Sequence, residues 1–201
     1  EKQDDYGPFI FLIEREKKLG LGTAYIYGFK WGLERDYQYF FEMDADFSHP
    51  PVDLLRLYKA CAEDGADVAI GSRYVPGGGV VNWPKDRLIL SKGASLYTRI
   101  ITGMPVMDPT AGFICYARPV LETLDLDKIR FVGYAFQIGM KYLAYKAGFT
   151  LKEVPIQFVE REFGVSKMHS GIIKEAIIGV LNLRLSSVFK PRRMKAKSTT
   201  E

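Results

Sequence analysis

The sequence contains few of the residues that define several common protein classes. Its 201 residues include two cysteines, and Cys61 and Cys115 stand too far apart to form a metal-binding motif or a disulfide framework. This cysteine usage favours a reducing compartment. A G-x-G-x-x-G pattern is absent, which argues against a dinucleotide-dependent dehydrogenase. The net charge of +4 is too small for a dedicated nucleic-acid-binding protein, so we expect no nucleic-acid partner.

Long apolar runs are also missing. The nearest candidate, residues 172–189, is interrupted by Lys174, Glu175 and Arg184, whereas a membrane-spanning helix needs about 18 or more apolar residues. We therefore expect no transmembrane helix. The sequence begins at Glu1 without an initiating Met and without a signal-peptide pattern, so we expect a processed chain, numbering from an internal point, or a missing segment in front.

The residues that are present suit a globular α/β domain. Apolar residues make up 47% of the chain and charged residues 26%, the balance of an ordinary soluble domain. Strand patterns at 9–14, 37–43, 67–70, 113–116 and 150–159 alternate with helix patterns at 23–35, 52–64, 87–102, 135–147 and 172–189, and residues 75–84 resemble a loop. This order predicts a mostly parallel sheet with helices on both faces and a ligand site beyond the carboxyl ends of its strands.

An acidic motif, EMDAD at residues 42–46, ends the second predicted strand. Asp44 and Asp46 are two residues apart and would share one face of an extended chain, where they repel each other unless a cation lies between them. Mg²⁺ and Mn²⁺ bind few protein carboxylates and complete their shell with phosphate oxygens and water, so the pair indicates diphosphate chemistry. The alternative is a polar turn before the next helix, and in that turn we expect His49 to face solvent.

Six motifs together carry a resemblance to a known family. They are GLGTAY at 20–25, EMDADFSH at 42–49, GSRY at 71–74, DPTAGF at 108–113, GYAFQ at 133–137 and REFGVSK at 161–167. In this order they resemble the dolichol-phosphate and polyprenol-phosphate mannose synthases, which are inverting family-two glycosyltransferases with the nucleotide-diphospho-sugar transferase (GT-A, Rossmann-like) fold. The resemblance implies transfer of mannose from GDP-mannose to a polyprenyl, dolichyl-type monophosphate, with inversion, at a divalent cation (Mg²⁺ or Mn²⁺).

The resemblance also implies roles for individual residues. Asp44 and Asp46 would hold the metal, with Ser48 as a weaker or water-mediated ligand, and Asp46 and Arg73 would be catalytic. The implied donor-binding residues are Lys18, Gly20, Gly22, Asp44, Asp46, Arg73, Asp108, Arg161 and Lys167, and the implied acceptor-phosphate residues are Arg87 and Ser166. An ionised acceptor phosphate would need little help from a general base.

Plainer interpretations stay open for several of these residues. The Gly20/Gly22 turn could be a simple strand–helix connection, and Asp108-Pro109 favours turn formation in any protein. Arg73 could form a surface ion pair, and the Arg and Lys of residues 161–167 could belong to a solvated loop.

The resemblance contains two departures. Relatives open with two further strands, which carry a PTYNE motif and an Asp-Asp pair and bind the nucleotide base and ribose, so we expect roughly 50 residues to be missing. Gly139 stands where relatives usually have Glu. We therefore divide the chain into a glycosyltransferase core at 1–167 that lacks its first two strands, a C-terminal amphipathic helix at 168–190 and a basic tail at 191–201.

A polyprenyl acceptor would lie in a membrane, which implies a peripheral enzyme at the cytoplasmic face and a possible membrane-protein subunit as partner. Helix 172–189 either packs on the core or lies in the membrane interface, followed by basic residues that attract anionic lipid. Two alternative functions remain on the same scaffold. One is glucosyl transfer from UDP-glucose, and the other is an inactive subunit with a nucleotide-sugar fold that supports a partner.

Overall fold

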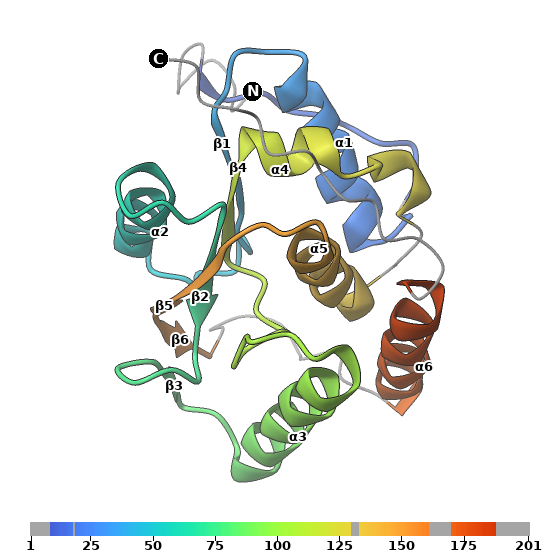
Figure 1. Cartoon of the computed structure of the whole chain (residues 1–201). Helices are drawn as coiled ribbons and strands as arrows, with labels where there is room; N and C mark the ends of the chain where they lie inside the picture. The colour runs from blue at the N-terminus through green and yellow to red at the C-terminus, as the bar shows by residue number, and fades with distance from the viewer. Residues whose placement is uncertain (1–8, 18, 130–132, 161–169, 188–201) are drawn as a thin grey trace.

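The computed structural model describes residues 9–17, 19–129, 133–160 and 170–187, and it leaves undescribed the side chains of residues 134, 170–176 and 186–187 (Figure 1). Its elements, in chain order, are α1 (Leu21–Leu33), β1 (Tyr39–Glu42), α2 (Val52–Ala62), β2 (Val68–Ser72), β3 (Gly79–Val81), α3 (Lys85–Thr102), β4 (Ile114–Ala117), α4 (Arg118–Thr123), a 3₁₀ turn (Leu126–Lys128), α5 (Tyr134–Lys146), β5 (Leu151–Pro155), β6 (Gln157–Val159) and α6 (Ser170–Ser187).

The central sheet has four strands in the order β1-β4-β2-β5. Strand β4 pairs antiparallel with β1 and with β2, and β2 pairs parallel with β5, so three strands run one way and β4 runs the other. Ile114, the first residue of β4, lies opposite both Glu42 and Ile70. The loop before β4 therefore reaches the sheet edge at which β1 and β2 end. The periodicity did not predict this reversed direction.

Helices cover both faces of the sheet, which confirms the predicted α/β fold class. Helix α2 packs on one face, over a small cluster that contains the free, buried thiols Cys61 and Cys115. Helices α1, α5 and α6 lie on the other side, over the larger core (Figure 1). Strand β2 shows the alternation that separates the two clusters, because Val68 and Ile70 belong to the larger one and Ala69 to the smaller.

Helix α6 packs against α3 and α5, and it adds Val180 and Leu183 to the larger core. Its neighbouring residues Ile177, Ile178 and Leu185 are exposed. Among the described residues, no helix is both long enough and apolar enough to cross a membrane. The division of the chain after residue 167 stays a prediction.

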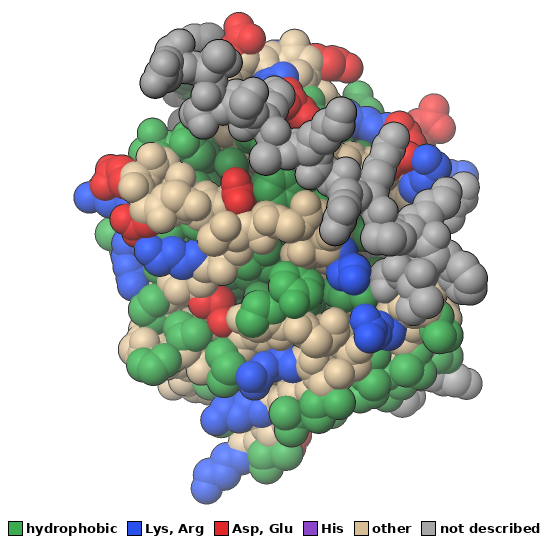
Figure 2. Space-filling view, viewed as in Figure 1, with side chains coloured by type: hydrophobic (Ala, Val, Ile, Leu, Met, Phe, Trp, Pro, Cys, Tyr) green, Lys and Arg blue, Asp and Glu red, His purple; other side chains and the backbone are tan. Residues whose placement is uncertain are grey.

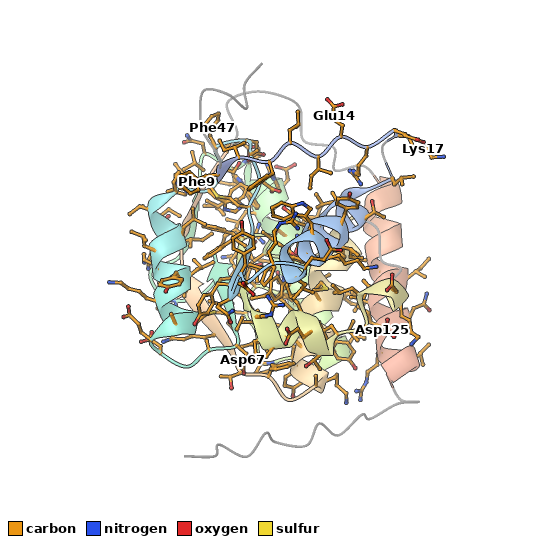
Figure 3. The ribbon with its side chains drawn as sticks, turned by 90° about the horizontal axis from the view of Figure 1, so that it is seen from above. Phe9, Glu14, Lys17, Phe47, Asp67 and Asp125 are labelled. Atoms are coloured by element: carbon orange, nitrogen blue, oxygen red, sulfur yellow. The ribbon has the colours of Figure 1, made fainter. Side chains whose placement is uncertain are left out.

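Two secondary-structure predictions are wrong. The predicted strand at 9–14 is absent, since none of these residues pairs with a described strand. Phe11 contacts Trp31 of α1 instead, with 4.8 Å between ring centroids. Figure 3 shows the segment from Phe9 to Lys17 on the outer side of α1. The predicted loop at 75–84 contains strand β3, which pairs parallel with β6. Three residues are too few for a periodic signal, and their partner lies far along the chain.

Candidate active site

A cavity of about 580 Å³ opens where β1 and β2 end and the loop before β4 arrives. One end is polar, and its lining includes Asp44, Asp46, His49, Arg73 and Arg87. The other end lies between α3 and α6, and its lining includes Ile89, Leu90, Ala94, Tyr97, Ile177 and Val180. Figure 2 shows hydrophobic side chains gathered over α3 and the neighbouring part of α6. The cavity therefore combines sites for charged and for apolar parts of a ligand.

The acidic pair follows β1 directly and lines the polar end. The Asp44 side chain is 45% exposed, and Asp46 Oδ1 accepts a hydrogen bond from the Ser48 backbone N–H at 3.2 Å. Phe47, between Asp46 and Ser48, has a φ of 61°, an uncommon value for a non-glycine residue. The chain turns sharply there, and the turn accompanies the contact between Ser48 and Asp46. Ser48 itself is fully buried and is not among the residues that line the cavity.

The acidic pair fits a hard cation that protein and phosphate share. In the described part of the chain, no group of three or more His, Cys, Asp or Glu side chains could hold a metal by itself. Mg²⁺ needs only one or two protein carboxylates when phosphate oxygens and water complete its shell. Asp44 and Asp46 supply that number beside an open cavity. Participation of the Ser48 hydroxyl stays a prediction.

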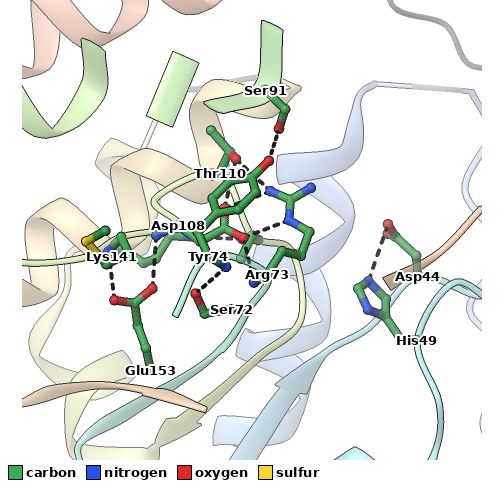
Figure 4. Close-up of polar contacts among 12 residues, drawn as sticks. Asp44, His49, Ser72, Arg73, Tyr74, Ser91, Asp108, Thr110, Lys141 and Glu153 are labelled. Carbon is green, nitrogen blue, oxygen red and sulfur yellow. Dashed lines mark hydrogen bonds and ion pairs between the residues drawn. The ribbon is translucent and has the colours of Figure 1, made fainter. Parts of the chain in front are cut away.

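His49 is buried, with 3% exposure, so the expectation that it faces solvent is wrong. Its ring packs on Phe113 and Phe158, with centroid distances of 4.8 and 5.1 Å. Burial lowers the pKa of His49 to about 4, so the imidazole is neutral near pH 7. Its Nε2 lies 4.0 Å from Asp44 Oδ2, and at neutral pH this contact is not an ion pair (Figure 4).

Arg73, just after β2, forms the best-defined polar contact of the site (Figure 4). Its Nε and Nη2 each donate to one carboxylate oxygen of Asp108 at 2.7 Å, and Nη2 also donates to Thr110 Oγ1 at 2.8 Å. Asp108 is fully buried and the Arg73 side chain is 10% exposed, so the alternative of a surface ion pair is wrong. Burial alone would raise the pKa of Asp108, but the charge and hydrogen bonds of Arg73 outweigh it and keep that pKa below its usual value.

Arg87, on α3, is held by an aromatic ring and a carboxylate. Its guanidinium lies 4.0 Å from the Trp83 ring centroid and forms an ion pair with Glu160. The Trp83 ring in turn contacts Phe158, with 5.3 Å between centroids, and the Arg73 guanidinium lies 5.4 Å from Trp83. Two arginines therefore share one aromatic group. Trp83 was not predicted as a site residue, although its place just before the helix that carries Arg87 was a usable signal.

Of the remaining predicted site residues, Gly20 and Gly22 are described and four others are not. Gly20 caps α1 with a φ of 102°, which favours glycine, and its carbonyl accepts a hydrogen bond from the Thr23 hydroxyl. Gly22 is buried in the first turn, and Leu21 between the two glycines lines the cavity. Lys18, Arg161, Ser166 and Lys167 lie outside the described residues. Gly139 is a buried residue of α5.

Two buried charged residues near the cavity were also not predicted from the sequence. Lys141 of α5 is fully buried, as is Glu42 at the end of β1. Burial raises the pKa of Glu42 to about 7, against the opposing charge of Lys141. No local pattern marks Lys141 as buried, because its interaction partners come from distant segments of the chain.

This sheet, the acidic pair at its edge and the arginine-lined cavity define a glycosyltransferase of the GT-A fold. Residues 1–125 match the family described as Glycosyl transferase family 2, which is more than half of the chain. The chain belongs to glycosyl transferase family 2.

Two curated relatives have closely similar sequences. The chain is 52% identical over 171 residues to polyprenol monophosphomannose synthase from Mycolicibacterium smegmatis, a match that covers 85% of this chain and 64% of that protein. It is 46% identical over 188 residues to undecaprenyl-phosphate mannosyltransferase from Micrococcus luteus, covering 94% of this chain and 76% of that protein. The chain thus spans less than two thirds of the first relative's length.

Solved structures with the same fold are more distant in sequence. Glucosyl-3-phosphoglycerate synthase from Mycobacterium tuberculosis in complex with phosphoglyceric acid superposes with a TM-score of 0.56 at 14% identity, over 88% of this chain and 56% of that chain. The complex of the same enzyme with Mn²⁺, UDP-glucose and glycerol 3-phosphate gives a TM-score of 0.53 at 16% identity, over 83% and 55% of the two chains. At these identities the likeness shows the fold alone.

Proposed function

We propose that this chain transfers mannose from GDP-mannose to a polyprenyl monophosphate, with inversion and with a divalent cation. The observation that carries the proposal is the two-part cavity, whose charged end suits two phosphate groups and whose apolar end suits a hydrocarbon chain. The identities of 52% and 46% to two polyprenyl-phosphate mannosyltransferases support the same substrates.

The donor diphosphate would bind at the acidic pair. Asp44 and Asp46 would hold Mg²⁺ or Mn²⁺, which neutralises the charge that develops on the leaving nucleotide diphosphate. Arg73 would add a guanidinium group in a fixed position at the same end, since Asp108 and Thr110 leave it little freedom. Asp108 is fully buried, so in this proposal it contributes to donor binding through Arg73. Lys18, Gly20, Gly22, Arg161 and Lys167 complete the proposed donor site.

The acceptor would place its phosphate near Arg87, with Ser166 as a second contact, and its hydrocarbon chain between α3 and α6. Arg87 is oriented by Trp83 and Glu160, and Ile89 and Ile177 face the cavity beyond it. A phosphate monoester loses its second proton near pH ~6, so the acceptor is already a competent nucleophile at neutral pH. Its oxygen would attack the anomeric carbon from the side opposite the diphosphate, which inverts the configuration. Positioning and charge neutralisation would supply most of the rate.

The exposed apolar residues suggest how the protein reaches such an acceptor. On α3, Ile89 is 72% and Ile100 is 71% exposed, and on α6 Ile178 and Leu185 are exposed as well. We propose that these helices contact the membrane surface at its cytoplasmic face, assisted by the basic residues of 190–197. A membrane-protein subunit is a further proposed partner.

A transfer assay on the full-length protein tests the proposal. GDP-mannose and UDP-glucose are each offered with a short polyprenyl phosphate, in Mn²⁺, in Mg²⁺ or in EDTA, and the unphosphorylated polyprenol serves as the control acceptor. We expect mannosyl transfer to the phosphate only, and its loss in EDTA. A preference for UDP-glucose would contradict the donor assignment. Absence of transfer from both donors would contradict the enzyme assignment in favour of an inactive subunit.

A further inference from the structure

Loop 107–112 is part of the connection between α3 and β4, which spans residues 103–113, and it carries both side chains that hold Arg73. Asp108 and Thr110 also contact each other, with Thr110 Oγ1 donating to Asp108 Oδ1 at 3.0 Å. Thr110 to Gly112 line the cavity. The position of the Arg73 guanidinium therefore depends on where the backbone of this loop lies.

Two charged side chains from other elements hold that backbone, one near each end (Figure 4). Glu153 of β5 accepts hydrogen bonds from the backbone N–H groups of Met107 and Asp108, at 2.7 and 2.9 Å. Lys141 of α5 donates from Nζ to the carbonyl of Ala111 at 2.6 Å. One element of the sheet and one helix thus fix the two ends of a six-residue loop.

The burial of Lys141 is unfavourable unless its ammonium group forms specific contacts. Lys141 is fully buried, and burying an ammonium group is unfavourable unless it is paired and hydrogen-bonded. Burial lowers the pKa of Lys141 to about 8, against the opposing charge of Glu42. Glu42 ends β1, two residues before Asp44. Lys141 therefore contacts loop 107–112 through Ala111, and its charge interacts with that of Glu42 at the end of β1.

We propose that Lys141 and Glu153 are positioning residues for sugar transfer, which clamp the backbone of loop 107–112 so that Asp108 and Thr110 hold Arg73 against the donor diphosphate. This inference rests on the proposed function. Neither residue touches the substrate in this arrangement. Loss of either clamp lets the loop shift, and a displacement of about 1 Å at a reacting centre can lower the rate about a hundredfold.

The test uses Lys141→Met, Glu153→Gln and the double variant in the full-length protein. Lys146→Met is the matched control, because Lys146 lies on the same helix and is exposed. Each single variant is expected to lower kcat for mannosyl transfer about ten- to hundredfold, with KM for the acceptor unchanged. The kcat of the double variant is expected to be at most about twofold lower than that of the less active single variant, because both clamps act on one loop. Lys146→Met should match the unmodified protein.

Hydrogen–deuterium exchange supplies a readout that needs no substrate. The amides of Met107, Asp108, residues 110–112 and Arg73 are expected to exchange faster in both single variants and at the unmodified rate in Lys146→Met. If Lys141→Met does not fold, the double variant Glu42→Gln/Lys141→Met replaces it in the test, because it leaves no Glu42 charge without a partner. Glu153→Gln tests the other clamp.

Several results would overturn the inference. They are an unchanged kcat in both single variants, effects that multiply in the double variant, or a lower kcat without faster exchange in the loop. If the unmodified protein transfers no mannose, the proposed function fails, whereas the exchange measurement still decides whether the clamp exists.

Discussion

The two ends of the cavity are built on different principles. At the polar end, every described arginine is held by fixed partners, Arg73 by Asp108 and Thr110 and Arg87 by Glu160 and Trp83. At the apolar end, two helices face each other through side chains such as Ile89 and Ile177, which are partly exposed. Directional contacts define the first end, and non-directional contact area defines the second.

This difference predicts different kinetic behaviour. Hydrogen-bonded charges act at a fixed geometry, so damage to the polar end should appear mainly in kcat. Apolar contact contributes in proportion to the area removed from water, so damage to the apolar end should appear mainly in KM for the acceptor. Substitutions at the two ends should therefore differ both in the size of their effect on transfer and in the kinetic constant that they change.

Asp46→Ala should have the largest effect, because it removes one of the two carboxylates that would hold the cation. We expect transfer to fall by at least about a thousandfold, while the thermal unfolding midpoint stays close to that of the unmodified protein. Asp127→Ala, an exposed carboxylate outside the cavity, is the matched control. Substantial metal-dependent turnover by Asp46→Ala would contradict the metal assignment.

Asp108→Asn should come next, because it breaks the buried pair with Arg73. We expect kcat to fall about a hundredfold. We also expect a loss of about 3–5 kcal/mol in the free energy of unfolding at pH 7, since Arg73 is left buried without its partner.

The stability difference should depend on pH in a defined direction. The folded-state pKa of Asp108 lies below its usual value, so its ionised form stabilises the fold above about pH 4 and this contribution is lost as the pH falls further. Urea unfolding of both proteins at pH 7 and pH 3 measures it. A gap between the two proteins that is equal at both pH values would contradict an ionised Asp108.

The local parts of this fold were predictable from the sequence, and the long-range parts were not. The helix at 52–64 was predicted from apolar spacing, and α2 occupies Val52–Ala62. The reversed direction of β4 depends on pairing with Phe40 and Val68, which no local pattern records. The same holds for β3, whose partner β6 lies far along the chain.

The site shows the same division. The positions of Asp44 and Arg73 at strand ends were predictable, since such ends line ligand sites in α/β proteins. The burial of His49 and the contact between Arg73 and Asp108 required the tertiary structure, because each joins residues from segments that are far apart in the sequence. Lys141 is the clearest case. Its helix predicts a place in the fold, but its contact with Ala111 depends on a loop 30 residues earlier.

Ile177→Asn tests the apolar end with a close control on the same helix. Ile177 is 43% exposed and lines the cavity, whereas Ile178 is 46% exposed and does not. If the acceptor chain lies between α3 and α6, Ile177→Asn should raise KM for a long-chain polyprenyl phosphate about three- to tenfold and leave kcat unchanged. Both variants are assayed with the acceptor in detergent micelles, where contact with a membrane plays no part, and there Ile178→Asn should leave both constants unchanged. Equal effects of the two substitutions would place the acceptor chain elsewhere.

Removal of residues 188–201 should have the smallest effect on transfer and separates membrane attraction from the affinity of the apolar end. This segment contains Lys190, Arg192, Arg193, Lys195 and Lys197. Each basic residue near an anionic surface contributes about 1 kcal/mol, so flotation with anionic vesicles should weaken while flotation with neutral vesicles changes little. Turnover of a short, water-soluble acceptor should be unchanged, because α6 with its core residues Val180 and Leu183 is kept. Equal flotation of both proteins with anionic vesicles would show that the exposed faces of α3 and α6, and not the basic segment, hold the protein at the membrane.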